Sequence, residues 1–130
     1  MMIASPFHIL TPRFIGTATL IVWVLVSGQP ASAGPLSKDD ALSTLRNQVT
    51  KDTLYPQMEC VNVFVEEESS KSFTVAIREN HNPHCGGDPD VAPVIDRFRI
   101  SRTKKTIEWY DVIDDDYRPY AEAVERRKQE

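Results

Sequence analysis

The spacing of the apolar residues changes at Pro56, and this change constrains the fold more than any other feature of the sequence. Pro56 cannot continue a helix, because proline lacks a backbone N–H. Beyond it, apolar and polar residues alternate, which is typical of strands. Before it, apolar residues recur at helical spacing behind the favoured N-cap residue Ser37: Ala41, Leu42, Leu45 and Val49. The pattern predicts a helix from about Lys38 to Lys51, followed by strands.

Alternating runs predict two β-hairpins. The first pairs residues 61–66 with 73–78 across the polar segment 67–72, and the second pairs residues 94–100 with 107–113 across a turn at 103–105. Each hairpin has one strongly apolar face, which a helix can cover. We therefore expect an α+β domain in which the N-terminal helix packs on a four-stranded antiparallel sheet made of the two hairpins. The charged tail, residues 121–130, is expected to be a frayed or exposed helix.

The first 33 residues have the features of a cleaved signal peptide. Arg13 is the one charged residue among them; it precedes the apolar run Phe14 to Val26, and Ala31, Ser32 and Ala33 offer small side chains for cleavage. The run is shorter than the roughly 20 residues that cross a bilayer as a helix. We expect residues 34–130 to be one small domain that is periplasmic or secreted, with no membrane attachment after cleavage. An uncleaved anchor or a buried core helix is the alternative.

Cys60 and Cys85 are the two cysteines of the chain. An exported chain meets an oxidising environment, so the even pair predicts one disulfide. Cys60 opens the first predicted strand and Cys85 lies beyond the second, and an antiparallel hairpin brings both to the same end of the sheet. Two free thiols, or a metal site, are the alternatives.

The segment 80–93, NHNPHCGGDPDVAP, is the most unusual stretch after the leader. Loops of this length are commonly functional, and a disulfide at Cys85 holds this one in shape. We predict a binding loop with four candidate residues: His81, His84, Asp88 and Asp90. A connection stapled only for stability is the alternative. Imidazole and carboxylate groups also suit zinc, but metal binding through Cys85 competes with the disulfide, so we predict no metal and no cofactor.

Asp96 shares the apolar face of one predicted strand, where an unpaired carboxylate is costly. We expect a structural ion pair with an arginine that is near in sequence, and a catalytic acid with a perturbed pKa is the alternative. The candidate partners are Arg78, Arg97 and Arg99.

The chain is acidic, with 15 lysines and arginines against 19 aspartates and glutamates. This balance argues against binding to nucleic acid through phosphate neutralisation, so we expect no nucleic-acid partner. Acidic and aromatic residues gather near the carboxyl end and predict a surface that attracts a basic protein; they are Tyr110, Asp114, Asp115, Asp116 and Tyr117. A solvated turn is the alternative.

No motif in the sequence assigns a nucleophile or a general base, so we do not expect an enzyme. The combined features predict an exported binding protein, an inhibitor or immunity factor that acts on a cationic enzyme such as a basic hydrolase or toxin. The second expectation is a structural or accessory component of an envelope complex. The third is a small metal-dependent hydrolase that uses His81 and His84.

Overall fold

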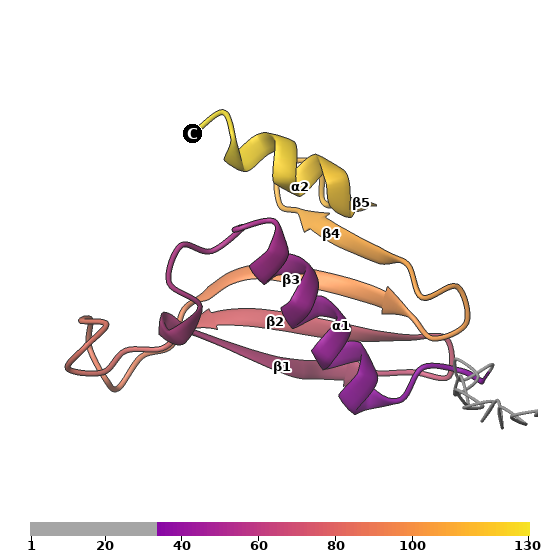
Figure 1. Ribbon diagram of the computed structural model, residues 1–130, viewed down its shortest axis with the longest axis horizontal. Coiled ribbons are helices and arrows are strands. Elements are labelled where there is room, and N and C mark those ends of the chain that lie inside the picture. The colour runs from indigo at the N-terminus through magenta and orange to yellow at the C-terminus, as the bar shows by residue number, and fades with distance from the viewer. Residues whose placement is uncertain (1–33) are drawn as a thin grey trace, which may run out of the picture. The chain divides into compact units, whose positions relative to one another are not determined.

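The computed structural model describes residues 34–130, and these residues have an α+β fold with a five-stranded antiparallel sheet, two α-helices and one disulfide (Figure 1). The predicted signal peptide lies outside the described residues. In chain order the elements are α1 (Lys38–Lys51), a 3-10 turn (Met58–Cys60), β1 (Val61–Glu68), β2 (Ser72–Glu79), β3 (Val94–Ser101), β4 (Ile107–Asp111), β5 (Asp116–Pro119) and α2 (Tyr120–Arg127). Within this part of the chain, no helix is long and apolar enough to cross a membrane.

Helix α1 begins and ends where the sequence pattern predicts. The Ser37 hydroxyl accepts a hydrogen bond from the Asp40 amide at 3.2 Å, which satisfies one free N–H group of the first turn. Asp40 at the start and Lys51 at the end also complement the helix dipole. The apolar stripe is fully buried against the sheet; it consists of Ala41, Leu45 and Val49.

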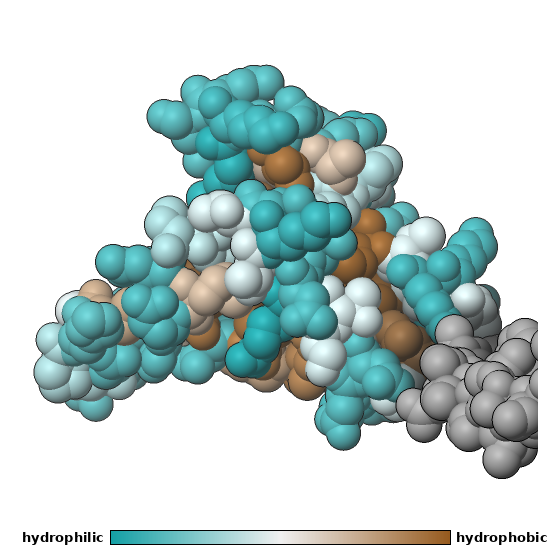
Figure 2. Space-filling view, in the orientation of Figure 1, coloured by the Kyte–Doolittle hydropathy of each residue, from teal (hydrophilic) through white to brown (hydrophobic). Residues whose placement is uncertain are grey.

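The strands follow one another as an antiparallel meander in the order β1-β2-β3-β4-β5. The two predicted hairpins join through β2 and β3, where Val75 pairs with Phe98 and Phe73 with Ile100. Helix α1 crosses the face that carries these four fully buried side chains (Figure 1). Figure 2 views the molecule from the same side, where hydrophilic residues cover most of the surface and apolar residues show between the elements.

The structure corrects the predicted four-stranded sheet at its carboxyl end. Strand β4 ends at Asp111 rather than at Ile113, residues 112–115 form a turn, and a fifth strand, β5, pairs with β4. Strand β5 is only 4 residues long and ends in Pro119. Its sequence therefore has no apolar alternation from which a strand can be predicted.

The charged carboxyl-terminal segment forms the expected helix, and most of its charged face is exposed, but one side of it packs on the sheet. Helix α2 buries Ala123 in the core. Arg126 lies 2.6 Å from the Asp111 carboxylate, and Arg127 lies 2.8 Å from that of Asp96. The charges of this helix attach it to the sheet, because both carboxylates are largely buried.

Asp96 is paired, but not with the arginines that the sequence suggested. Its carboxylate accepts hydrogen bonds from the Tyr55 hydroxyl at 2.5 Å, from Trp109 Nε1 at 3.0 Å and from Arg127 at 2.8 Å. Burial and the charge of Asp96 raise the pKa of Tyr55 far above its usual value. The three arginines near Asp96 in sequence pair instead with glutamates on the opposite face of the sheet, because successive side chains of a strand alternate: Arg78, Arg97 and Arg99.

Candidate functional site

Two connections of the meander lie at the same end of the sheet, where strands β2 and β4 finish. Strands β2 and β4 are both antiparallel to β3, so they run in the same direction and their arrowheads point the same way in Figure 1. The β2–β3 connection, residues 80–93, is called the pinned loop below, and the β4–β5 turn with its flanking residues, 111–117, is called the hairpin tip. Strands β2 and β4 are two strand spacings apart, about 10 Å. The pinned loop and the hairpin tip together are called the loop edge below, meaning the end of the sheet at which these two connections lie. It holds all the predicted site residues except Cys60 and Tyr110, and Tyr110 directly precedes the hairpin tip.

The pinned loop is held in one shape by covalent and backbone contacts. The predicted disulfide joins Cys60 to Cys85, with the two Cα atoms 5.5 Å apart. The Asn82 side chain accepts hydrogen bonds from the amides of His84 and Cys85, each at 2.9 Å, and the Gly86 amide donates to the Asn82 carbonyl at 2.8 Å. Asp88 makes a second local turn, in which its carboxylate accepts from the Asp90 amide at 3.0 Å.

The two histidines of the pinned loop have different surroundings. His81 is largely buried: Nδ1 lies 2.8 Å from the Asp88 carbonyl oxygen, and Nε2 bonds to the Glu79 carboxylate. The Asp88 carbonyl and then the Glu79 carboxylate raise the pKa of His81, because both accept hydrogen bonds from the ring and so stabilise its protonated form. The His84 side chain is exposed, and its Nε2 lies 3.9 Å from Glu59. His81 therefore holds the loop together, while His84 faces solvent beside the disulfide.

The hairpin tip is ordered by a buried carboxylate at its base. Asp111 is 2% exposed and accepts two hydrogen bonds from Arg126, at 3.1 and 2.6 Å, and one from the Ile113 amide at 2.9 Å. The Arg126 and Ile113 donors hold the pKa of Asp111 below its usual range. Asp111 pairs with Asp116 across β4 and β5, which places it at the base of the turn, below the exposed aspartates.

The predicted acidic residues of the hairpin tip are brought together with both tyrosines. The Asp114 carboxylate lies 2.6 Å from Arg118, and the Tyr110 hydroxyl donates to Asp115. The hydrogen bond to Asp115 raises the pKa of Tyr110. The rings of Tyr110 and Tyr117 lie 5.2 Å apart, centre to centre. The turn thus presents three successive aspartates on a fixed backbone.

The loop edge also carries exposed apolar side chains that the sequence analysis missed. Four large hydrophobic residues are exposed in the described part of the chain: Phe64 at 36%, Val91 at 48%, Val112 at 75% and Ile113 at 79%. Three of them belong to the loop edge, Val91 in the pinned loop and the other two in the hairpin tip. Val112 and Ile113 directly precede three aspartates, and this turn-forming sequence is the signal that separates them from strand β4.

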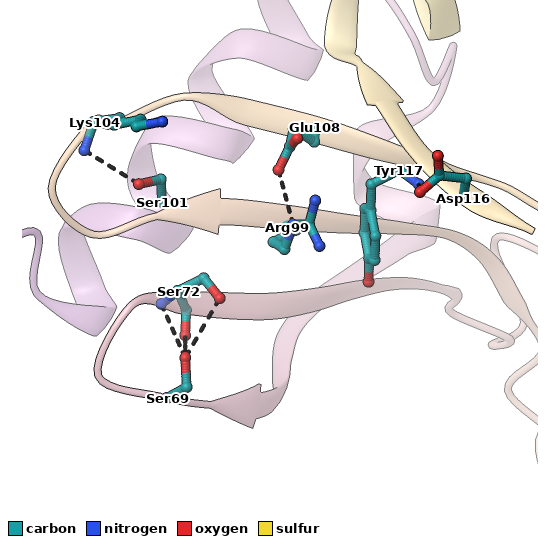
Figure 3. Close-up of polar contacts among 8 residues, drawn as sticks. All are labelled: Ser69, Ser72, Arg99, Ser101, Lys104, Glu108, Asp116 and Tyr117. Carbon is teal, nitrogen blue, oxygen red and sulfur yellow. Dashed lines mark hydrogen bonds and ion pairs between the residues drawn. The ribbon is translucent and has the colours of Figure 1, made fainter.

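The outer face of the sheet is different in character (Figure 3). Arg99 donates from Nε to Glu108 at 2.8 Å, and its guanidinium lies 4.1 Å from the centre of the Tyr117 ring. Glu66 pairs with Arg97 and Arg78, which hold the pKa of its carboxyl below the usual range. These ion pairs cross-link neighbouring strands and satisfy one another, so this face has the features of a solvated, self-paired surface.

Three potential metal ligands gather at the base of the pinned loop. A carboxylate oxygen of Glu59, the sulfur of Cys60 and an imidazole nitrogen of His84 all lie within 4.8 Å of one another. Cys60 is bonded to Cys85, which leaves two ligands for a metal while the disulfide is intact. His81 is not part of this group, because its ring is turned toward Glu79 and Asp88.

Comparison of the chain with protein-family models and with curated proteins, and of the structure with solved structures, found no match. What the chain does must be inferred from its own residues.

Proposed function

We propose that this chain is an exported binding protein that inhibits a cationic enzyme, and that the loop edge is its binding surface. The observation that carries the proposal is the concentration of exposed apolar side chains and aspartates on two connections of the same sheet edge. Val91, Val112 and Ile113 provide apolar contact area, and aspartates lie beside them in sequence on both connections.

An apolar centre with a charged rim is the usual composition of a protein interface. A few residues buried at the centre of an interface supply most of the binding energy, and rim charges raise the association rate and orient the partner. The carboxylates of the loop edge select a partner whose surface is basic: Asp88, Asp90, Asp114, Asp115 and Asp116. A basic hydrolase or toxin meets this requirement.

The rigidity of both connections supports inhibition as the mode of action. The disulfide and the Asn82 hydrogen bonds order the pinned loop, and Asp111 orders the hairpin tip. A surface that is already ordered loses little conformational entropy on binding, which favours tight complexes. Because both connections lie at the end of the sheet where β2 and β4 finish, both can contact a single enzyme surface, and a standard interface covers roughly 800 Å² on each partner.

The test is affinity capture with the oxidised protein, residues 34–130, from envelope and secreted fractions, followed by activity assays of each captured enzyme. The proposal expects a basic enzyme whose activity falls to zero at one equivalent of the protein, and whose capture is lost on reduction of the disulfide. Capture that is equally strong with V112S/I113S, or capture without inhibition, would contradict it.

A second function, an accessory component of an envelope complex, is favoured by the open edge of β1. This strand pairs only with β2 within the described residues, and free strand edges accept a partner strand. The Asn80 amide donates to the Cys60 carbonyl, and hydrogen-bonded pairs alternate with non-hydrogen-bonded pairs along an antiparallel ladder. Val63, three residues further on, therefore has its backbone N–H and C=O directed away from β2. Stoichiometric co-purification with an envelope assembly that is lost in Val63→Pro, and kept in V112S/I113S, would identify this function.

A further inference from the structure

The disulfide lies beside two side chains that match the ligand preferences of zinc. Glu59 and His84 directly precede Cys60 and Cys85 in sequence, so each half of the disulfide brings one further ligand with it. The ligand atoms of Glu59, Cys60 and His84 are within 4.8 Å of one another, and Cys85 is bonded to Cys60. Two sulfurs, one imidazole and one carboxylate therefore occupy a single small volume at the base of the pinned loop.

This set has the number and chemistry of a tetrahedral zinc site. Zinc binds thiolate sulfur at about 2.3 Å and imidazole nitrogen or carboxylate oxygen at about 2.0 to 2.2 Å, so ligand atoms around one ion are roughly 3 to 4 Å apart. Glu59 and His84 are exposed and free to make the adjustment of about 1 Å that this requires. What prevents binding in the oxidised protein is the bond between the two sulfurs.

We propose that reduction of the Cys60–Cys85 disulfide opens a zinc site formed by Glu59, Cys60, His84 and Cys85. In the first step a dithiol reductant transfers two electrons and two protons to the disulfide, which gives two thiols, while the reductant becomes a cyclic disulfide. In the second step Zn²⁺ binds both sulfurs as thiolates, and two protons are released to solvent. The disulfide and the zinc ion each close the same loop, but both use the sulfurs of Cys60 and Cys85, so they cannot be present together.

The zinc site gives a role to His84, which the binding function does not use. The His84 side chain is exposed and makes none of the hydrogen bonds that order the pinned loop. The His81 side chain makes two of them. Because zinc joins the same two chain segments as the disulfide, it restores the loop closure that reduction removes. The reduced protein therefore regains stability with zinc, and this gain increases with pH because protons are released on binding.

The test is a zinc titration of the purified protein, oxidised or reduced with dithiothreitol and desalted without oxygen, in competition with a chromophoric chelator. We expect one zinc per reduced chain and none per oxidised chain. His84→Ala should weaken binding by at least about tenfold, since even outer-shell partners of zinc ligands contribute about 10- to 100-fold to affinity. Glu59→Gln should also weaken it. The matched control Glu67→Gln, which changes an exposed carboxylate at the other end of β1, should change it less than about twofold.

A second readout covers the case in which the reduced chain unfolds. Far-ultraviolet circular dichroism should then regain the native signal on addition of zinc, and the midpoint of thermal unfolding should rise with zinc concentration. The proposal is overturned by any of three results: no zinc bound by the reduced chain, equal binding by the oxidised chain, or binding that His84→Ala and Glu59→Gln leave unchanged. It is also overturned if a reduced, unfolded chain stays unfolded with zinc.

Discussion

Gly87 lies against the ring of His81 so closely that a Cβ atom at position 87 would be 2.5 Å from two of its carbon atoms. The φ angle of Gly87 is +82°, a left-handed conformation that other residues adopt only at a cost. The absence of a side chain at Gly87 therefore allows the ring of His81 to reach the Asp88 carbonyl and close the pinned loop.

Gly87→Ala is expected to loosen the pinned loop much more than Gly86→Ala. Gly86 also has a positive φ, +76°, but a Cβ atom there meets nothing within 4 Å. Gly86→Ala should therefore cost only the left-handed strain of about 1 to 2 kcal/mol. Gly87→Ala adds the clash with His81, so its free energy of unfolding should be lower than that of Gly86→Ala in denaturant titrations. Equal losses in the two variants would show that His81 does not pack as described.

The contribution of His81 to stability should depend on pH. Its pKa is raised in the folded protein above the unfolded value of about 6.5. The stabilisation is then complete below about pH 6.5 and is lost as pH rises through the folded pKa. The difference in unfolding free energy between wild type and His81→Ala should shrink from pH 5.5 to pH 8. Titration of the His81 ring by NMR should give a pKa above that of an unfolded peptide, and Glu79→Gln should lower it.

Loss of the disulfide should destabilise the protein substantially. Cys60 and Cys85 are 25 residues apart, and closing a loop of this length lowers the entropy of the unfolded chain. C60S/C85S should lose roughly 3 to 4 kcal/mol in the free energy of unfolding without added metal. A reductant should reduce the stability of wild type to the same value and leave the double variant unchanged. A loss below about 1 kcal/mol would contradict this account of the pinned loop.

Asp111 should stabilise the hairpin tip only at pH values at which its carboxyl group is ionised. Its folded pKa is depressed, so its stabilisation is present above the unfolded value of about 3.9 and is lost as pH falls through the folded pKa. Asp111→Asn should therefore be clearly less stable than wild type at pH 7, and the difference should shrink in acid. Hydrogen exchange of the Ile113 amide at pH 7 should be faster in Asp111→Asn than in wild type. Asp114→Asn, which breaks an exposed pair, is the control and should cost less than about 1 kcal/mol.

Helix α1, the two hairpins and the disulfide are predictable because each depends on local patterns. The helical stripe with its N-cap and the alternation of the strands report burial directly, and Cys60 and Cys85 are the only cysteines available to pair. The α2 helix and β5 strand are held instead by contacts between distant residues. Arg126 binds Asp111 and Arg127 binds Asp96, and no periodicity in a charged segment reveals such pairs.

The polar residues of the candidate site are marked by the sequence, whereas its exposed apolar residues and its assembly are not. The composition of segment 80–93 and the run of aspartates at 114–116 mark them both as unusual. These two segments lie at the same end of the sheet because β5 pairs with β4, which makes residues 112–115 a hairpin turn at that end. The exposure of Val112 and Ile113 follows from the same turn, since in a continuous strand one of the two would face the core.

The most direct test of the binding surface is the affinity of matched variants for the captured enzyme. V112S/I113S and D88N/D90N change the two connections of the loop edge, and K71A/K104A changes the turns at the opposite edge. The account predicts that each loop-edge variant binds at least about tenfold more weakly, a loss of about 1.4 kcal/mol, and that the opposite-edge variant is unchanged within about twofold. Full affinity in both loop-edge variants, or a loss confined to K71A/K104A, would place the binding surface elsewhere.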